Sequence, residues 1–280
     1  MIHAQERRMW MITERIPISV GTKPTEAVLQ TYFMDASDEL FDSDKRPAIL
    51  LMPGGAYRYT SDREAEPIAL RLNAMGYQVA VLRYSCAPAA FPQALWECAA
   101  AFRFLKDNAA EYNIDKKRIL TMGFSAGGHL AASLGIYWNH PLITEVFQDH
   151  TLRPYAQILC YPVITAGVQA HEESFRNLLQ EDYDKPEMRE LVSLERQVHR
   201  DVPRTFIWHT HSDPTVPVAN SLLFASALVK AGVLCEFHMY DKGPHGLATA
   251  GKLTRRSDGE KLQPECESWL SLLETWLNSL

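Results

Sequence analysis

The sequence predicts an α/β fold in which a mostly parallel central sheet carries helices on both faces. Short, continuously apolar runs, typical of strands buried on both faces, recur along the chain. They alternate with segments whose apolar residues recur at helical spacing. Repeated strand–helix units favour a parallel sheet, and the ligands of such sheets bind beyond the carboxyl ends of the strands.

Length and composition fit one globular domain. The chain has 280 residues, of which 46% are hydrophobic and 22% charged, as in an ordinary soluble protein. Because α/β folds of this size are routinely built on one sheet, we expect a single domain over residues 1–280. The net charge is −6 and the lysines and arginines are scattered, so we expect neither nucleic acid nor a membrane as a partner.

The cysteines and the N-terminus predict a cytoplasmic location. The five cysteines are widely spaced and form no Cys-x-x-Cys pair, which favours buried free thiols in a reducing compartment over a disulfide framework or a zinc cluster. Residues 1–10 carry charge where a signal peptide needs an apolar stretch. No later segment approaches the length of a transmembrane helix.

The chain opens with two predicted strands, residues 16–20 and 27–34, the second from its alternation of apolar and polar residues. Residues 35–45 are polar and acidic, which is typical of a solvated loop. The apolar run at residues 47–52 predicts a strand buried on both faces. It ends in a glycine-rich loop at residues 53–57.

Ser61 and Glu64 have the spacing of a capping box. We therefore expect a helix over residues 61–75, with Ser61 as its N-cap and the Glu64 carboxylate reaching back to it. A buried strand is predicted at residues 77–82. The next helix is predicted over residues 92–112, because it begins with a proline, which suits a first helical position, and continues with apolar residues on one face.

The second half of the chain continues this alternation around one insertion. Residues 162–201 are polar and hold only short helical patterns, so we expect a lid-like insertion near the carboxyl end of the sheet. The amphipathic pattern over residues 260–280 predicts a C-terminal helix. The other predicted strands are residues 155–161, 205–209 and 235–240, and the other predicted helices are residues 130–138 and 220–231.

The motif Gly123-x-Ser125-x-Gly127 lies between the apolar run at residues 118–120 and the helix predicted at residues 130–138. This is the pattern of a nucleophile elbow, in which a strained turn between strand and helix lifts a serine hydroxyl clear of the backbone. Small flanking residues are needed there because strand and helix approach closely. Ser125 is therefore the candidate nucleophile.

A serine nucleophile needs a histidine to take its proton and a carboxylate to orient that histidine. His245 fits best, because residues 242–246 form a tight loop just after the last predicted strand. Asp213 directly follows the preceding strand and completes the chain order serine, acid, histidine. Asp241 is the competing acid, but only three residues separate it from His245.

His209, His211 and Asp213 also alternate, as metal ligands on one face of a strand would. No further metal-ligand pair accompanies them, so we expect no metal and interpret both histidines as structural.

An oxyanion needs preorganised N–H donors. The amide that follows the nucleophile, that of Ala126, is one candidate, and Gly55 and Ala56 of the glycine-rich loop are the others.

Four motifs together resemble those of the α/β-hydrolase superfamily. They are Pro53-Gly54-Gly55-Ala56-Tyr57, Gly123-Phe124-Ser125-Ala126-Gly127-Gly128-His129, the segment from His209 to Pro217, and Gly243-Pro244-His245-Gly246. Within it the chain is similar to bacterial carboxylesterases of the acetyl esterase and acetylxylan esterase kind. The resemblance covers the chain from about Ala48 onwards. It departs at Pro53, where related esterases often have histidine, and at Ala56, where they have a third glycine.

The resemblance implies an α/β-hydrolase fold and a serine carboxylesterase that works through an acyl-enzyme, without a cofactor. It also implies short acyl groups, above all acetyl, with acetylated sugars or xylo-oligosaccharides as candidate substrates. Tyr57, Tyr59 and Trp138 are candidates for an aromatic platform under a sugar ring, with Tyr57 the preferred substrate-binding residue, and core packing is the alternative role. Two alternative functions are a prolyl-oligopeptidase-like peptidase and a non-catalytic ligand-binding protein on the same scaffold. Separately, sheet edges or the C-terminal helix could form a homodimer.

Overall fold

The computed structural model describes residues 11–36 and 45–280. The charged N-terminal segment, residues 1–10, and most of the acidic loop predicted at residues 35–45 lie outside the described residues.

Within the described ranges, eight strands form one sheet in the order β1-β2-β4-β3-β5-β6-β7-β8. The pairs β1–β2 and β2–β4 are antiparallel, and every other neighbouring pair is parallel, which confirms the predicted mostly parallel sheet. The strands are β1 (Arg15–Val20), β2 (Lys23–Tyr32), β3 (Arg46–Met52), β4 (Gln78–Arg83), β5 (Ile114–Phe124), β6 (Ala156–Cys160), β7 (Arg204–Thr210) and β8 (Cys235–Tyr240).

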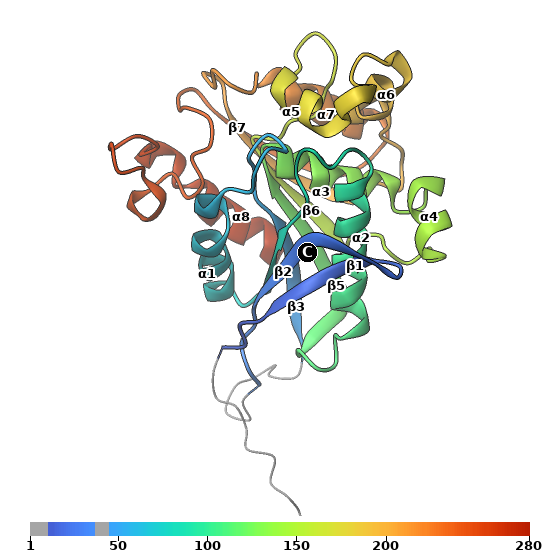
Figure 1. Cartoon of the computed structure of the whole chain (residues 1–280). Coiled ribbons are helices and arrows are strands. Elements are labelled where there is room, and N and C mark those ends of the chain that lie inside the picture. Colours follow the sequence, from blue (N-terminus) through green and yellow to red (C-terminus); the bar gives the residue numbers. More distant parts are fainter. Residues whose placement is uncertain (1–10, 37–44) are drawn as a thin grey trace, which may run out of the picture.

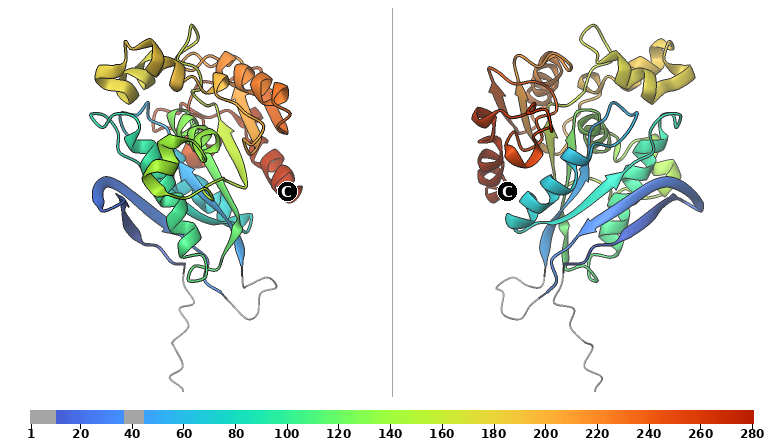
Figure 2. Two further views of the ribbon diagram at one scale, coloured as in Figure 1. Left: turned by 90° about the vertical axis from the view of Figure 1, so that its right-hand side faces the viewer. Right: turned by 60° about the vertical axis from the view of Figure 1, so that its left-hand side comes forward.

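Helices cover both faces of the sheet, as expected (Figures 1 and 2). α1 and α8 pack on one face and form one apolar core with it. α2, α3, α4 and α7 pack on the other face and contribute to a second, larger core. The helices are α1 (Glu66–Ala74), α2 (Gln93–Asp107), α3 (Ala126–Tyr137), α4 (Pro141–Phe147), α5 (Glu172–Leu179), α6 (Pro186–Leu191), α7 (Ala219–Lys230) and α8 (Trp269–Asn278).

The predicted capping box at Ser61 is wrong. The side chain of Ser61 makes no capping hydrogen bond, and a short 3₁₀ turn at Asp62–Glu64 precedes α1, which begins only at Glu66. The carboxylate of Glu64 is buried and accepts hydrogen bonds from residues distant in sequence. A capping pattern is a local signal, and these tertiary contacts override it.

The C-terminal helix is shorter than the predicted range of residues 260–280. α8 begins at Trp269, and a 3₁₀ turn at Pro264–Cys266 precedes it. Pro264 lacks the N–H that a helix interior requires, so a continuous helix cannot run from residue 260 through this position. The apolar side of α8 is buried within the chain, so it is not a free surface for a homodimer; its buried residues are Trp269, Leu270, Leu273, Trp276 and Leu277.

Residues 162–201 fold into α5, α6 and 3₁₀ turns at Gln180–Asp182 and Leu194–Arg196. These elements lie above the carboxyl ends of the parallel strands, at the top of Figure 1. The segment therefore occupies the end of the sheet where the sequence predicts the site.

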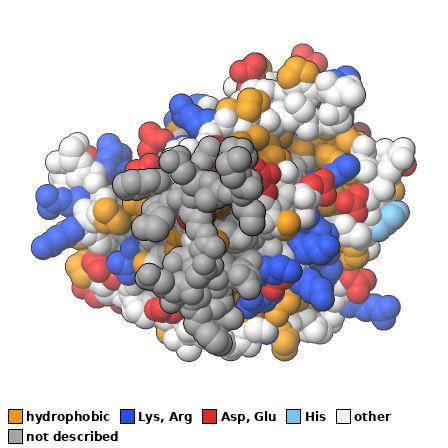
Figure 3. Space-filling view, turned by 90° about the horizontal axis from the view of Figure 1, so that it is seen from below, with side chains coloured by type: hydrophobic (Ala, Val, Ile, Leu, Met, Phe, Trp, Pro, Cys, Tyr) orange, Lys and Arg blue, Asp and Glu red, His pale blue; other side chains and the backbone are white. Residues whose placement is uncertain are grey.

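The surface seen from below carries both basic and acidic side chains, and several basic ones gather to the right of the grey residues in Figure 3. In the described part of the chain, no helix is both long and apolar enough to cross a bilayer.

Backbone segments pack closely where β5 turns into α3. A Cβ on Gly127 would come within 2.1 Å of the carbonyl oxygen of Met52, and one on Gly123 within 2.0 Å of the carbonyl oxygen of Gly127. Because these neighbours are backbone atoms, they cannot rotate away. Glycine is therefore required at both positions for β3, β5 and α3 to approach this closely.

We predict that Gly127→Ala lowers the free energy of unfolding by about 3 kcal/mol or more, because the added methyl group must displace the backbone of β3. Gly167→Ala is the matched control, since its Cβ would meet only the Thr165 hydroxyl, at 3.1 Å, and the Arg196 guanidinium, at 3.8 Å. Urea unfolding of both variants measures the difference. Equal midpoints for Gly127→Ala and the wild type would contradict this packing.

Candidate active site

The turn after β5 holds Ser125 in the conformation expected of a nucleophile elbow. Its backbone has φ 53° and ψ −120°, a strained conformation for a residue with a side chain. The Ser125 N–H donates to the carbonyl of Cys160 at 3.0 Å, and the Ser125 carbonyl accepts from the N–H groups of His129 and Val163. The main chain on both sides of the turn thus fixes the position of the hydroxyl.

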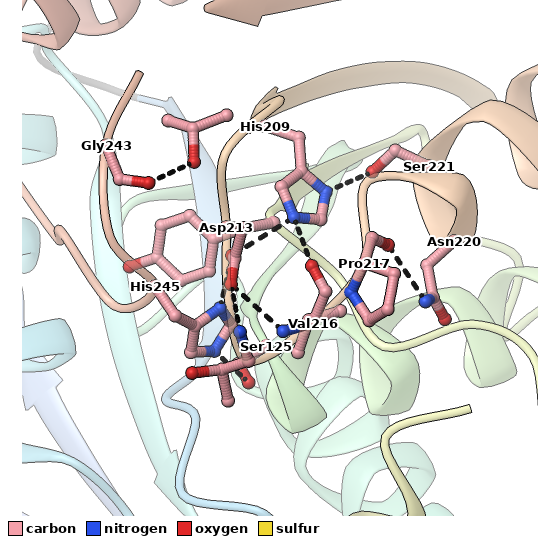
Figure 4. Close-up of polar contacts among 12 residues, drawn as sticks. Ser125, His209, Asp213, Val216, Pro217, Asn220, Ser221, Gly243 and His245 are labelled. Atoms are coloured by element: carbon pink, nitrogen blue, oxygen red, sulfur yellow. Dashed lines mark hydrogen bonds and ion pairs between the residues drawn. The ribbon is translucent and has the colours of Figure 1, made fainter. Parts of the chain in front are cut away.

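The structure brings the three predicted triad residues together (Figure 4). His245 Nε2 lies 2.8 Å from Ser125 Oγ, and His245 Nδ1 lies 2.7 Å from Asp213 Oδ2. Because the Asp213 carboxylate only accepts, Nδ1 carries the proton and Nε2 is left as the acceptor for the serine hydroxyl. This is the tautomer that a general base needs.

The Asp213 carboxylate is almost completely buried, with 1% of its side chain exposed. Burial raises the pKa of Asp213, but hydrogen bonds from His209 and His245 outweigh it and hold the pKa well below the ordinary value. Oδ1 also accepts the amide N–H groups of Thr215 and Val216, at 2.8 and 2.9 Å. The competing acid, Asp241, lies exposed at the end of β8.

The glycine-rich loop after β3 passes directly beside Ser125, since a Cβ on Gly54 would lie 2.9 Å from the Ser125 Cβ. Gly55 and Ala56 both have positive φ, 135° and 56°. The carbonyl of Gly55 accepts from two amides of its own loop, and the carbonyl of Ala56 accepts from the side chain of Asn177. The N–H groups of Gly55, Ala56 and Ala126 donate to no acceptor in the described part of the chain.

A cavity of about 260 Å³ opens over Ser125 and His245. Its walls include parts of the glycine-rich loop after β3, of α5 and the residues before it, and of the segment after β8. Among the described residues, no Val, Leu, Ile, Met, Phe or Trp lines it. A larger cavity, of about 420 Å³, surrounds the start of β3 at Arg46 and contains neither serine nor histidine. The polar side chains that line the smaller cavity, apart from Ser125 and His245, are Arg58, Tyr59, Ser61, Arg63, Glu64, His171, Glu173, Thr215, Arg256 and Lys261.

The three aromatic residues proposed as a platform lie in different surroundings. Tyr57 is 3% exposed and does not line the cavity, because its ring packs in the core and its hydroxyl bonds to His129. Trp138 does not line the cavity either. Tyr59 lines it and is 54% exposed. Of the three, only Tyr59 lines the cavity, and the buried position of Tyr57 favours the alternative role in core packing.

Comparison with known proteins places the chain in a family. The BD-FAE family model matches residues 38–228. The crystal structure of an acetyl ester-xyloside bifunctional hydrolase from Caldicellulosiruptor lactoaceticus matches with a TM-score of 0.81 and 35% identity, over 95% of this chain and 96% of that one. The chain belongs to the BD-FAE family of α/β-hydrolase esterases. This membership confirms the resemblance that the sequence motifs predicted.

Curated relatives of this α/β hydrolase include larger proteins. The endo-1,4-beta-xylanase B of Butyrivibrio fibrisolvens is 37% identical over 218 residues, which cover 75% of this chain and 34% of that protein. The acetylxylan esterase of Xylanibacter ruminicola is 30% identical over 204 residues, which cover 71% of this chain and 40% of that protein. The chain thus spans less than half the length of either relative.

The buried ring of His209 makes hydrogen bonds that its spacing in the sequence did not predict. Its ring is fully buried, with Nε2 at 3.2 Å from Asp213 Oδ2 and Nδ1 at 2.8 Å from Ser221 Oγ. Nε2 therefore donates to the carboxylate, and Nδ1 accepts from the serine hydroxyl. His211 lies exposed, and no group of three or more metal-ligating side chains occurs among the described residues.

His129 connects the elbow helix of this hydrolase to two other segments. Its Nδ1 accepts the hydroxyl of Tyr57 at 2.9 Å, and its Nε2 donates to the carbonyl of Val192 at 2.9 Å. Burial lowers the pKa of His129 to about 4, so the ring is neutral when the protein is folded at neutral pH.

We predict that His129 makes the folded state sensitive to acid. Because its pKa lies below the unfolded value of about 6.5, this contribution is fully present above pH 6.5 and is lost as the pH falls towards 4. His129→Gln can keep both hydrogen bonds without titrating. The loss of unfolding free energy between pH 7 and pH 5 should therefore be about 2 kcal/mol smaller in this variant than in the wild type.

Urea unfolding at the two pH values measures this difference. The control is His211→Gln, which changes an exposed histidine outside the buried contacts. If the wild type and His129→Gln lost the same unfolding free energy between pH 7 and pH 5, His129 would not be the source of the acid sensitivity.

Proposed function

We propose that the chain is a serine carboxylesterase that hydrolyses short-chain acyl esters through an acyl-enzyme. The observation that carries the proposal is the hydrogen-bonded series from Ser125 Oγ through His245 to Asp213, at 2.8 and 2.7 Å. The esterases among the relatives support it. Neither the serine mechanism nor the acyl preference follows from family membership alone.

In the proposed mechanism, Ser125 Oγ attacks the ester carbonyl carbon while His245 Nε2 takes the hydroxyl proton. The negative charge on the carbonyl oxygen is stabilised by the amides of Gly55, Ala56 and Ala126. Asp213, held ionised by its donors, stabilises the imidazolium. His245 then protonates the departing alcohol oxygen, and a water molecule, activated by the same ring, hydrolyses the acyl-enzyme and releases the acid.

The cavity supports a small acyl group on a polar alcohol. It lacks the large apolar side chains that would stabilise a long acyl chain, and its polar side chains offer hydrogen bonds to hydroxyl groups. The exposed ring of Tyr59 adds an aromatic surface of the kind on which sugar rings pack. The acetylxylan esterase among the relatives supports acetyl esters of sugars or xylo-oligosaccharides as the substrate class.

We also propose that residues 162–201 act as a lid-like part of a single domain. α5 reaches the oxyanion loop through a bond from Asn177 Nδ2 to the Ala56 carbonyl, at 2.8 Å, and through an ion pair between Glu173 and Arg58, at 3.0 Å. His171, just before α5, lines the cavity. The predicted cytoplasmic location stays a prediction.

We predict that Ser125→Ala and His245→Ala each lower kcat for p-nitrophenyl acetate by at least about 10³-fold, because each removes a group on which the proton transfer depends. Ser133→Ala is the matched control, since Ser133 lies on α3, the helix that follows Ser125, and its hydroxyl donates to the His129 carbonyl. A fluorophosphonate should label the wild type and the control but not Ser125→Ala. Substantial hydrolysis by either triad variant would refute the mechanism.

We predict that kcat/KM falls along the series p-nitrophenyl acetate, butyrate and octanoate, with octanoate at least about 10-fold below acetate, because the cavity has no large apolar side chain to contact the longer chain. Release of acetate from acetylated xylo-oligosaccharides tests the alcohol preference. A rise in kcat/KM with chain length would contradict the assignment of a short acyl group.

A further inference from the structure

Glu64 carries a buried carboxylate in the wall of the cavity that the triad mechanism does not use. The residue is 4% exposed. Its Oε2 accepts the amide N–H of Gly54 at 2.8 Å, and its Oε1 accepts the hydroxyl of Tyr161 at 2.7 Å. Each carboxylate oxygen therefore has a protein donor, one from the oxyanion loop and one from the residue that follows β6.

Tyr161 extends these contacts to the loop that carries the candidate base. Its hydroxyl accepts the amide N–H of Ala248 at 2.8 Å, and Ala248 follows His245 by three positions. The Tyr161 ring also packs edge-on against the His245 ring, with the centroids 5.0 Å apart. The residue itself has φ 37°, and its N–H donates to the Trp208 carbonyl at 2.7 Å.

These contacts join three loops that are distant in sequence. Gly54 lies directly before the two amides of the oxyanion loop and within contact distance of the Ser125 side chain, because a Cβ there would lie 2.9 Å from the Ser125 Cβ and 2.7 Å from Glu64 Oε2. A shift of the Glu64 carboxylate would therefore move the oxyanion donors and the His245 loop relative to Ser125.

We propose that Glu64 is a positioning residue for ester hydrolysis: through Gly54 and Tyr161 it fixes the oxyanion loop against the loop of His245. The proposal rests on the proposed reaction at Ser125. A carboxylate suits the task because it presents two acceptors to two donors. Glutamine has the same shape but only one oxygen, so it can accept from Gly54 or from Tyr161 but not from both. With its oxygen on the Gly54 amide, its NH2 group faces the Tyr161 hydroxyl, whose proton then lacks this acceptor.

The test compares Glu64→Gln, Glu64→Ala and Tyr161→Phe with p-nitrophenyl acetate as the substrate. We expect kcat to fall about 10-fold in Glu64→Gln and in Tyr161→Phe, and about 100-fold in Glu64→Ala, because misplacement of reacting groups by up to an ångström costs this much. KM should stay within about 2-fold of the wild-type value, since groups that act in the transition state are displaced. The double variant Glu64→Gln/Tyr161→Phe should lose less than the product of the single losses, because both substitutions remove the same hydrogen bond.

The matched control is Glu66→Gln. Glu66 also accepts a tyrosine hydroxyl, that of Tyr32 at 3.0 Å, but it does not line the cavity. We expect its kcat to equal that of the wild type. Unfolding midpoints, and kcat per active site titrated with a fluorophosphonate, separate positioning from a loss of folded protein.

The proposal is overturned if folded Glu64→Gln and Tyr161→Phe keep kcat within about 2-fold of the wild type and change only the unfolding midpoint, or if KM rises while kcat is unchanged. If Glu64→Ala does not fold, the kcat values of Glu64→Gln and Tyr161→Phe alone test the proposal. A wild type that hydrolyses no ester would refute the proposed function. The rate at which the fluorophosphonate labels Ser125 in the same variants would then still decide the role of Glu64.

Discussion

The close approach of two strands and one helix at the elbow is the constraint on which the site depends. Gly127 of α3 lies so close to the Met52 carbonyl at the end of β3 that no side chain fits between them. This contact places the end of β3 beside the end of β5, so the glycine-rich loop leaves β3 next to Ser125. Ser125 and the amides of the glycine-rich loop thus follow neighbouring parallel strands, at the edge where such sheets bind their ligands.

Around this contact, donors surround the buried carboxylate of Asp213. Asp213 receives two amides and two histidine rings, and its pKa is lowered although burial acts in the opposite direction. Removing a donor from such a group leaves buried charge uncompensated. His209 therefore supports the orientation of Asp213, and through it that of His245, without a hydrogen bond between His209 and Ser125. Each oxygen of the Glu64 carboxylate likewise accepts a hydrogen bond, from Gly54 and from Tyr161.

The contacts between residues 162–201 and the glycine-rich loop differ in energetic weight. The Arg58–Glu173 ion pair joins side chains that are 64% and 48% exposed, so solvent screens it and it contributes at most about 1 kcal/mol. The bond from Asn177 to the Ala56 carbonyl holds backbone directly, and His129 links Tyr57 behind the loop to Val192 of the segment. Hydrogen bonds to the loop and its neighbours, more than surface charge, join the segment to the site.

The sequence by itself determined the alternating fold, the elbow at Ser125 and the chain order that selects Asp213 and His245. These features are local, because apolar periodicity, glycine spacing and position relative to the ends of strands can each be recognised within a short stretch of the sequence. The tertiary structure alone decided that Glu64 bonds to Gly54 and Tyr161, that His209 supports Asp213 and that Tyr57 lies in the core. Each of these roles depends on a partner whose distance in space cannot be read from its distance in sequence, except for the pair His209 and Asp213. The spacing of His209 and Asp213 could be recognised in the sequence, but the burial of both side chains and the hydrogen bond between them could not.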